Sequence, residues 1–158
     1  MTTALFPGSF DPFHRGHLEV VERALGIFDT VIVAVLRNPS KSAPLFSATE
    51  REEMILECFD GSEALRVTSM DGLVVDAART VGADVLVKGL RAATDFENEL
   101  QMAQMNRELS GIDTVFVPTS SSFSFIASRL IREIARLGGD VSPFVPEPVM
   151  TRMKERFA

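Results

Sequence analysis

Short apolar runs alternate along the chain with segments in which apolar residues recur every three or four positions. Residues 31–36 carry no polar side chain, as is typical of a strand that is buried on both faces of a parallel sheet. Runs of this kind predict five β-strands, at residues 3–6, 30–36, 65–68, 85–87 and 114–117.

The segments between these runs have the spacing of amphipathic helices. Ser47 and Glu50 fit a capping box, in which a hydroxyl and a carboxylate each accept from a free amide of the first turn. Leu73 and Val74 are expected in the core by their pattern. The spacing predicts helices at residues 16–27, 48–60, 73–81, 95–109 and 124–137, and a short last helix that ends near residue 156.

Strand and helix alternate five times, which predicts a parallel sheet with right-handed crossovers and helices on both faces. The fold class is therefore α/β, with a Rossmann-like five-stranded parallel sheet. A chain of 158 residues that is 46% hydrophobic is long enough to bury a core as one domain. We expect residues 1–158 to form that single domain, with a C-terminal helical extension from about residue 143.

Cations and hydroxyls follow the predicted strands, and parallel α/β sheets bind ligands outside the carboxyl ends of their strands. The first strand leads through a loop with Gly8 to a helix that begins near Gly16, and the free amides of a first helical turn favour anions. The groups that we expect at this edge are Ser9, His17, Arg37, Lys41, Lys88, Arg91, Ser128, Arg129 and Arg132. The sequence thus predicts a polyphosphate site.

Composition argues against several other classes of protein. The net charge is −6 and Trp and Tyr are absent, whereas a nucleic-acid surface normally carries basic excess and stacking aromatics. Cys58 is the only cysteine, which excludes a disulfide framework, and its place in a predicted helix predicts a buried thiol. We find no signal-peptide pattern and no apolar run near the about 20 residues that span a bilayer. We therefore expect a cytoplasmic protein without nucleic-acid or membrane partners.

Residues 14–17 read HRGH, and neither GxGxxG nor GxxxxGK[ST] occurs after the first strand. The HRGH segment resembles the (T/H)xGH motif of the nucleotidyltransferase superfamily. The blocks PGSFDP, PSK, GLRA followed by DFE, MNR and GDV resemble the bacterial phosphopantetheine adenylyltransferase family over nearly the whole chain. This resemblance implies transfer of AMP from ATP to 4′-phosphopantetheine, giving dephospho-coenzyme A and pyrophosphate in coenzyme A biosynthesis. It also implies a homohexamer and coenzyme A as a feedback ligand.

The same resemblance assigns roles to individual residues. It implies catalytic roles for His17, Lys41 and Arg91, while His14 supports the loop. The acceptor site so implied consists of Ser9, Lys41, Leu73, Val74 and Lys88. The ATP site consists of Ser9, Phe10, His17, Gly89, Leu90, Arg91, Glu99, Phe123, Ser124, Phe125, Ile126, Ala127, Ser128 and Arg129.

Without the family resemblance, the residue types and their pattern leave other interpretations open. His17 could cap its own loop, Lys41, Lys88 and Arg91 could be exposed loop charges, and Glu99 could be a solvated carboxylate. The apolar stripe formed by Met102, Met105 and Leu109 could be a subunit contact or ordinary core packing. The chain also departs from the family at Ala127 and Arg129, where the family has serines, and at Lys88 and Asn98, where many members have Arg and Tyr.

No His, Asp or Glu cluster has the spacing of metal ligands, so we expect Mg²⁺ to enter through the ATP phosphates. Two other functions compete with the first. One is the same chemistry on another phosphorylated acceptor, such as glycerol phosphate with CTP or a nicotinate mononucleotide with ATP. The other is a non-catalytic ATP-binding module.

Overall fold

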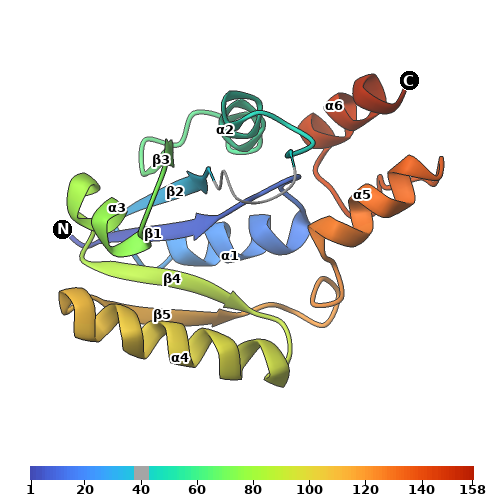
Figure 1. The fold of residues 1–158 in the computed structure, drawn as a ribbon. Coiled ribbons are helices and arrows are strands. Elements are labelled where there is room, and N and C mark those ends of the chain that lie inside the picture. The colour runs from blue at the N-terminus through green and yellow to red at the C-terminus, as the bar shows by residue number, and fades with distance from the viewer. Residues whose placement is uncertain (38–42) are drawn as a thin grey trace.

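A computed structural model describes residues 1–37 and 43–158 (Figure 1). Strands and helices alternate along the chain, as the sequence predicts. The elements are β1 (Thr3–Gly8), α1 (Arg15–Leu25), β2 (Thr30–Leu36), α2 (Ala48–Glu57), β3 (Leu65–Met70), α3 (Val74–Val81), β4 (Val85–Leu90), α4 (Ala93–Ser110), β5 (Asp113–Pro118), α5 (Ser128–Arg136) and α6 (Glu147–Phe157). No helix among the described residues has the length and apolar character needed to cross a bilayer.

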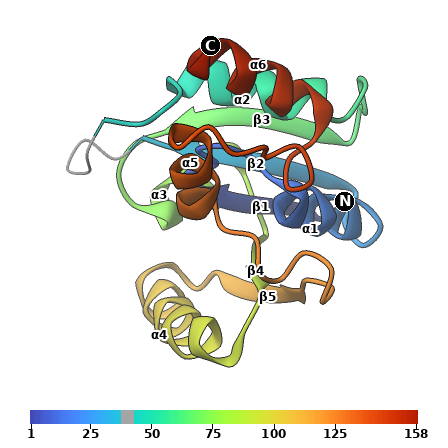
Figure 2. The ribbon, with the colours of Figure 1, turned by 90° about the vertical axis from the view of Figure 1, so that its right-hand side faces the viewer.

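The strands form one parallel sheet in the order β3-β2-β1-β4-β5, which confirms the predicted fold class (Figure 2). The chain order reverses between β1 and β4, and such a switch point is where open parallel sheets bind ligands. β1 pairs with β2 along its whole length, but its pairing with β4 is confined to Ala4 and Leu5. The carboxyl ends of β1 and β4 therefore separate and leave room for a ligand.

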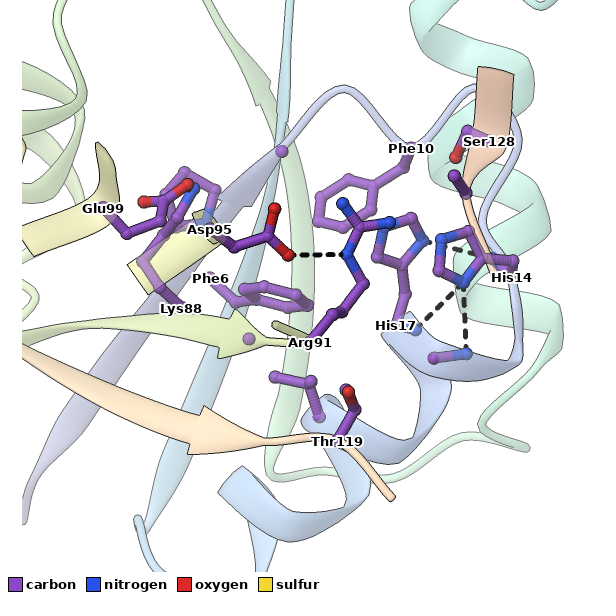
Figure 3. A pocket seen from close by; sticks show the side chains of 16 residues that line it. Phe6, Phe10, His14, His17, Lys88, Arg91, Asp95, Glu99, Thr119 and Ser128 are labelled. Atoms are coloured by element: carbon purple, nitrogen blue, oxygen red, sulfur yellow. Dashed lines mark hydrogen bonds and ion pairs between the residues drawn. The ribbon is translucent and has the colours of Figure 1, made fainter. Parts of the chain in front are cut away.

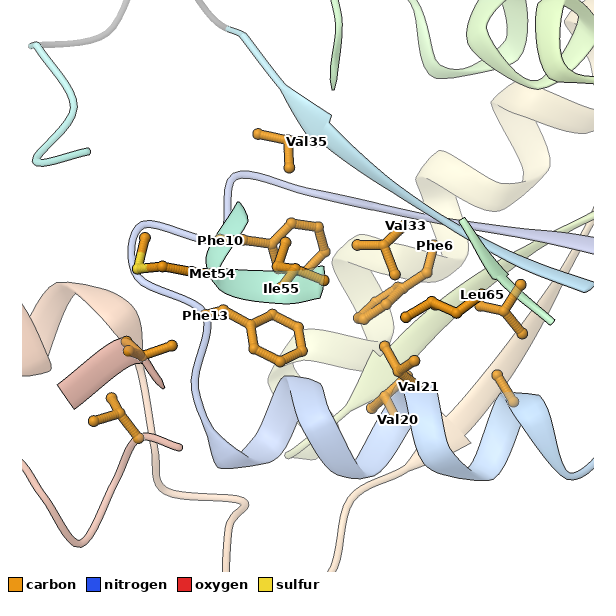
Figure 4. Close-up of a cluster of buried hydrophobic side chains, with 14 of the residues drawn as sticks. Phe6, Phe10, Phe13, Val20, Val21, Val33, Val35, Met54, Ile55 and Leu65 are labelled. Carbon is orange, nitrogen blue, oxygen red and sulfur yellow. The ribbon is translucent and has the colours of Figure 1, made fainter. Parts of the chain in front are cut away.

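Alternating residues of the buried strands face two separate cores, because successive side chains of a strand point to opposite faces. Val31 and Val33 of β2 belong to the larger core, which α1 and α2 cover with residues such as Val21 and Met54 (Figure 4). Ile32 belongs to the smaller core on the other face, together with side chains of α3. Helices therefore cover both faces, as predicted.

The helix predicted from residue 124 begins later in the structure, so this predicted start is wrong. Residues 121–125 form turns, and α5 begins at Ser128. The guanidinium of Arg91 donates to the carbonyl of Ile126 at 2.9 Å, and this carbonyl would otherwise accept from a helical amide four residues later. The Arg91 side chain, distant in sequence, thus competes with the helical amide for the Ile126 carbonyl. The spacing of nearby apolar residues cannot reveal this competition.

The prediction that Leu73 lies in the core is also wrong. Leu73 precedes the first residue of α3 and its side chain is 58% exposed, whereas Val75 and Ala78, three positions apart, form the buried face of the helix. Val74 is half-buried and packs against the smaller core. Cys58 is half-buried at the end of α2, and burial raises the pKa of its thiol to about 12.

Helix α4 has no buried residue, although its sequence carries many apolar side chains. Met102, Met105 and Leu109 are each more than half exposed, so core packing within this chain does not explain their stripe. The helix lies along β4 and β5 at one edge of the sheet (Figure 1).

Candidate active site

A cleft of about 310 Å³ lies at the carboxyl ends of β1 and β4 (Figure 3). Pro7 and Gly8 of β1 form one wall, and Lys88 and Gly89 of β4 form the other. Eight of the residues that the sequence assigns to the ATP or acceptor site line this cleft: Phe10, His17, Lys88, Gly89, Arg91, Glu99, Ala127 and Ser128.

Two histidines hold the N-terminus of α1 by capping each other. The backbone amides of Gly16 and His17 donate to His14 Nδ1 at 3.1 and 3.4 Å. In return, the backbone amide of His14 donates to His17 Nδ1 at 3.2 Å. The two rings stack with their centroids 3.6 Å apart. His14 therefore supports the loop, and His17 does cap its own loop, in addition to lining the cleft.

These hydrogen bonds fix which nitrogen of His17 carries its proton. A ring nitrogen that accepts from an amide has no hydrogen, so a neutral His17 is protonated on Nε2. An imidazole in this state donates one hydrogen bond from Nε2 without carrying positive charge. His17 is thus a fixed neutral donor beside the cleft.

Close packing leaves no space for a side chain at Gly16, beside the His14 ring. A Cβ at Gly16 would lie 3.0 Å from His14 Cε1 and 3.1 Å from His14 Nδ1, tighter than ordinary van der Waals contact. The rings of Phe10 and His17 meet edge to face with 4.9 Å between their centroids, and the Phe13 ring centroid lies 5.5 Å from that of His17. The His17 ring therefore has little freedom to turn.

Two cations of the cleft are each paired with a carboxylate of α4. Lys88 Nζ lies 3.4 Å from Glu99 Oε2, and Arg91 Nε lies 3.1 Å from Asp95 Oδ2 (Figure 3). All four side chains are partly exposed, so each pair contributes little to stability. A polyphosphate in the cleft would compete with these carboxylates for the two cations.

The N-terminus of α5 forms the far end of the cleft. No side chain among the described residues caps this helix, so the amides of its first turn remain available to an anion. The hydroxyl of Ser128 donates to the carbonyl of Pro12 at 2.8 Å. Its single hydrogen is thus used within the protein, and the amides are the better donors to a phosphate here.

Lys41 lies outside the described residues. Several other residues assigned from the sequence do not line the cleft. Arg129 is exposed and pairs with Glu133. The other assigned residues outside the lining are Ser9, Leu73, Val74, Leu90, Phe123, Ser124, Phe125 and Ile126.

The sequence did not single out Asp95 and Thr119, which line the cleft. It also did not single out Arg51, whose guanidinium donates to the Ser9 carbonyl in the loop before α1. Asp95 could have been found, since it lies only four positions after Arg91, in the first turn of the predicted helix, and carries the opposite charge. Arg51 gives no such signal, because its partners are backbone carbonyls from distant segments.

The site keeps both histidines uncharged. Burial lowers the pKa of His14 from 6.5 to about 3, and the positive charge of Arg91 adds to this effect. Burial also lowers the pKa of His17 well below its ordinary value, with smaller contributions from His14, Arg91 and Lys88. Both directions agree with the hydrogen bonds, because protonation of either Nδ1 would break them.

These pKa shifts predict that acid destabilises the fold. A lowered pKa means that the unfolded chain binds protons below pH 6.5 while the folded chain does not. Protonation of His14 in the unfolded chain should then remove about 2 kcal/mol of unfolding free energy between pH 7 and pH 5, and His17 should lower it further in the same direction. Urea unfolding of the wild type and of the double variant His14→Gln/His17→Gln measures this loss. Equal losses in the two proteins would contradict the prediction.

Residues 5–134 match the family described as Cytidylyltransferase-like, a region that runs from β1 into α5 and includes the whole cleft. The chain belongs to the cytidylyltransferase-like family. The family assignment agrees with the nucleotidyltransferase-type HRGH segment, which the structure places at the start of α1.

Solved structures with the same fold include a bifunctional NMN adenylyltransferase/ADP ribose pyrophosphatase from Francisella tularensis, complexed with AMP and a manganese ion. It is 14% identical to this chain, with a TM-score of 0.74, and the match covers 98% of this chain and 48% of the other. A second structure of the bifunctional protein gives 15% identity, a TM-score of 0.74, and 98% and 49% coverage. This chain thus spans about half the length of these proteins, and the likeness shows the fold.

Proposed function

We propose that this protein transfers AMP from ATP to 4′-phosphopantetheine, giving dephospho-coenzyme A and pyrophosphate. The observation that supports it best is the neutral His17 donor, held beside Lys88 and Arg91 in a cleft at the switch point of the sheet. Family membership supports nucleotidyl transfer in general. The GLRA and DFE blocks of the sequence support this acceptor in particular.

The reaction needs an in-line attack by a phosphate oxygen of the acceptor on the α-phosphorus of ATP. A new P–O bond forms, and the bond from the α-phosphorus to the bridging oxygen of pyrophosphate breaks. The acceptor phosphate is already ionised, so no residue has to remove a proton from it. Catalysis then consists of positioning and stabilisation of charge on the phosphate oxygens.

The residues of the cleft and three further residues assigned from the sequence divide these tasks. His17 Nε2–H donates to an oxygen of the α-phosphate, and Arg91 neutralises charge beside it. The free amides at the N-terminus of α5 bind the β- and γ-phosphates, with Arg129 adding positive charge at the same end. Lys88, Ser9 and Lys41 orient the acceptor phosphate, and Glu99 binds the ribose once the acceptor phosphate has displaced it from Lys88.

Mg²⁺ enters this proposal as part of the nucleotide. The described residues contain no group of three His, Cys, Asp or Glu side chains that could hold a metal ion. Asp95 and Glu99, the carboxylates of the cleft, both face cations. A metal ion would therefore be held by the phosphate oxygens and water, and it would offset charge on the leaving pyrophosphate.

A pyrophosphate-release assay tests the proposed function. ATP and CTP are each paired with 4′-phosphopantetheine, glycerol 3-phosphate and nicotinamide mononucleotide. We expect release with ATP and 4′-phosphopantetheine. ATP binding without turnover of this pair would overturn the proposal.

Adenylyl transfer to a mononucleotide is the second candidate. It is favoured by the likeness of the fold to a protein described as an NMN adenylyltransferase. The same cleft could perform that transfer, because attack on the α-phosphorus is common to both reactions. Release of pyrophosphate from ATP with nicotinamide mononucleotide, and with neither of the other two acceptors, would establish this second function.

We also propose that the protein is a homohexamer that uses the exposed apolar stripe of α4. Met102, Met105 and Leu109 supply this stripe, and they lie on the helix outside both cores. Analytical ultracentrifugation should give about six times the mass of one chain. A monomer at micromolar concentration would contradict this part of the proposal.

A further inference from the structure

We propose that Arg51 is a positioning residue for the proposed transfer. It holds the loop between β1 and α1 so that the Phe10 ring keeps the His17 imidazole in place. The effect on turnover rests on the proposed function, but the effect on His17 does not. Arg51 itself does not line the cleft, so it acts through the loop and makes no contact with substrate.

Arg51 is buried, with 4% of its surface exposed, and its guanidinium joins three segments of backbone. Its Nη1 donates to the carbonyl of Ser9 at 2.6 Å and to that of Leu36, the last residue of β2, at 3.3 Å. Its Nε donates to the carbonyls of Phe46 and Ser47 at 3.1 and 3.2 Å. A buried guanidinium whose Nε and Nη1 both donate to carbonyls fixes those carbonyls relative to one another.

The bond to Ser9 controls the backbone conformation of the next residue. The Ser9 carbonyl belongs to the peptide plane that precedes Phe10, and rotation of this plane changes φ of Phe10. That angle is +50°, in the left-handed region that a residue with a bulky side chain rarely adopts. Such a conformation is strained and persists where surrounding contacts hold it.

Further contacts hold the same loop on the other side of Phe10. The guanidinium of Arg132 donates to the carbonyl of Asp11. The carboxylate of Asp11 accepts from the amides of Leu45 and Phe46 at 2.8 and 2.9 Å. The loop is thus fixed on both sides of Phe10, and Arg51 holds the peptide plane that sets its φ.

The left-handed turn directs the Phe10 ring inward, where 2% of the residue is exposed. There the ring meets His17 with 4.9 Å between centroids and an angle of 86°. His14 stacks on the same imidazole. If the plane before Phe10 turned toward negative φ, the Phe10 ring would leave His17, and the imidazole would gain freedom to tilt.

Arg51 could instead serve only to stabilise the fold, through its bonds to the Phe46 and Ser47 carbonyls at the start of α2. This structural role and the positioning role predict different results. A structural role lowers stability alone, whereas a positioning role lowers turnover in folded protein and changes the surroundings of His17.

The test compares Arg51→Lys and Arg51→Met with Arg152→Lys as a matched control. Lysine keeps the charge, but its single nitrogen lacks the planar fork in which Nη1 meets the Ser9 carbonyl while Nε meets the Phe46 carbonyl. Arg152 pairs with Glu53 and Glu57 of α2 from helix α6 and does not touch the loop. Steady-state kinetics give kcat and KM for each protein, and NMR gives the Hε1 and Cε1 shifts of His17 in the folded state.

We expect kcat of Arg51→Lys to fall about 10- to 100-fold, with KM for ATP within about threefold of wild type. The His17 resonances should shift in Arg51→Lys and stay unchanged in Arg152→Lys. Unchanged His17 resonances in folded Arg51→Lys, or a loss of kcat no larger than in Arg152→Lys, would overturn the proposal.

Phe10→Leu covers the case in which the Arg51 variants do not fold. It removes the ring from His17 while leaving the Arg51 bonds in place, so it should reproduce the fall in kcat and the His17 shift. Wild-type kcat and His17 resonances in Phe10→Leu would overturn the proposal. Should the wild type transfer no AMP, the proposed function fails while the His17 resonances still decide the role of Arg51.

Discussion

Replacing His17 by alanine should lower kcat about 10²- to 10³-fold while KM for ATP changes by less than about threefold. The imidazole is held by the His14 amide and by the rings around it, so its Nε2–H is oriented before substrate arrives. A donor fixed in this way stabilises charge that grows in the transition state. Steady-state kinetics with ATP and the acceptor measure both constants.

Two conservative variants sharpen this test. A glutamine amide places a nitrogen donor close to where Nε2 lies, whereas an asparagine amide places it close to Nδ1. His17→Gln should therefore retain more activity than His17→Asn. Equal losses in kcat and in affinity for ATP, or an asparagine variant better than the glutamine variant, would mean that His17 does not act through Nε2–H.

Replacing Arg91 by methionine should lower kcat/KM about 10- to 100-fold, since a hydrogen bond to a charged group is worth about 1.5–3 kcal/mol. The substitution removes a cation from the cleft and leaves the Asp95 carboxylate unpaired beside the phosphates. It also releases the Ile126 carbonyl just before α5. Kinetics with varied ATP concentration measure the loss.

The matched control for Arg91 is Arg107→Met. Arg107 lies on α4 and pairs with exposed Asp113, and it does not line the cleft. Its replacement should leave kcat/KM within about twofold of wild type. The double variant Arg91→Met/Asp95→Asn should recover part of the lost activity, because it removes the repulsion from Asp95. A double variant as impaired as Arg91→Met would show that this repulsion contributes little.

Much of the fold could be predicted from the sequence, because local patterns and topology agree. The apolar run of β2 indicates a strand buried on both faces, and the Ser47–Glu50 capping box begins α2 as predicted. The convergence of His17, Lys88 and Arg91 follows from the rule that parallel strands share one carboxyl edge. These features depend on short segments and on strand order.

What could not be predicted depends on contacts between side chains and backbone groups. The start of α5 is displaced because Arg91 holds the Ile126 carbonyl. The tautomer of His17 depends on the backbone amide of His14, which donates to Nδ1. Partners of this kind are backbone groups, which every residue carries, so residue types do not reveal them.

The central claim concerns the acceptor, and a competition between acceptors tests it most directly. The protein is incubated with ATP, Mg²⁺ and equal amounts of 4′-phosphopantetheine, nicotinamide mononucleotide, nicotinate mononucleotide and glycerol 3-phosphate, and mass spectrometry identifies the adenylylated product. We predict dephospho-coenzyme A, together with an equal amount of pyrophosphate. A dinucleotide as the main product would contradict the claim.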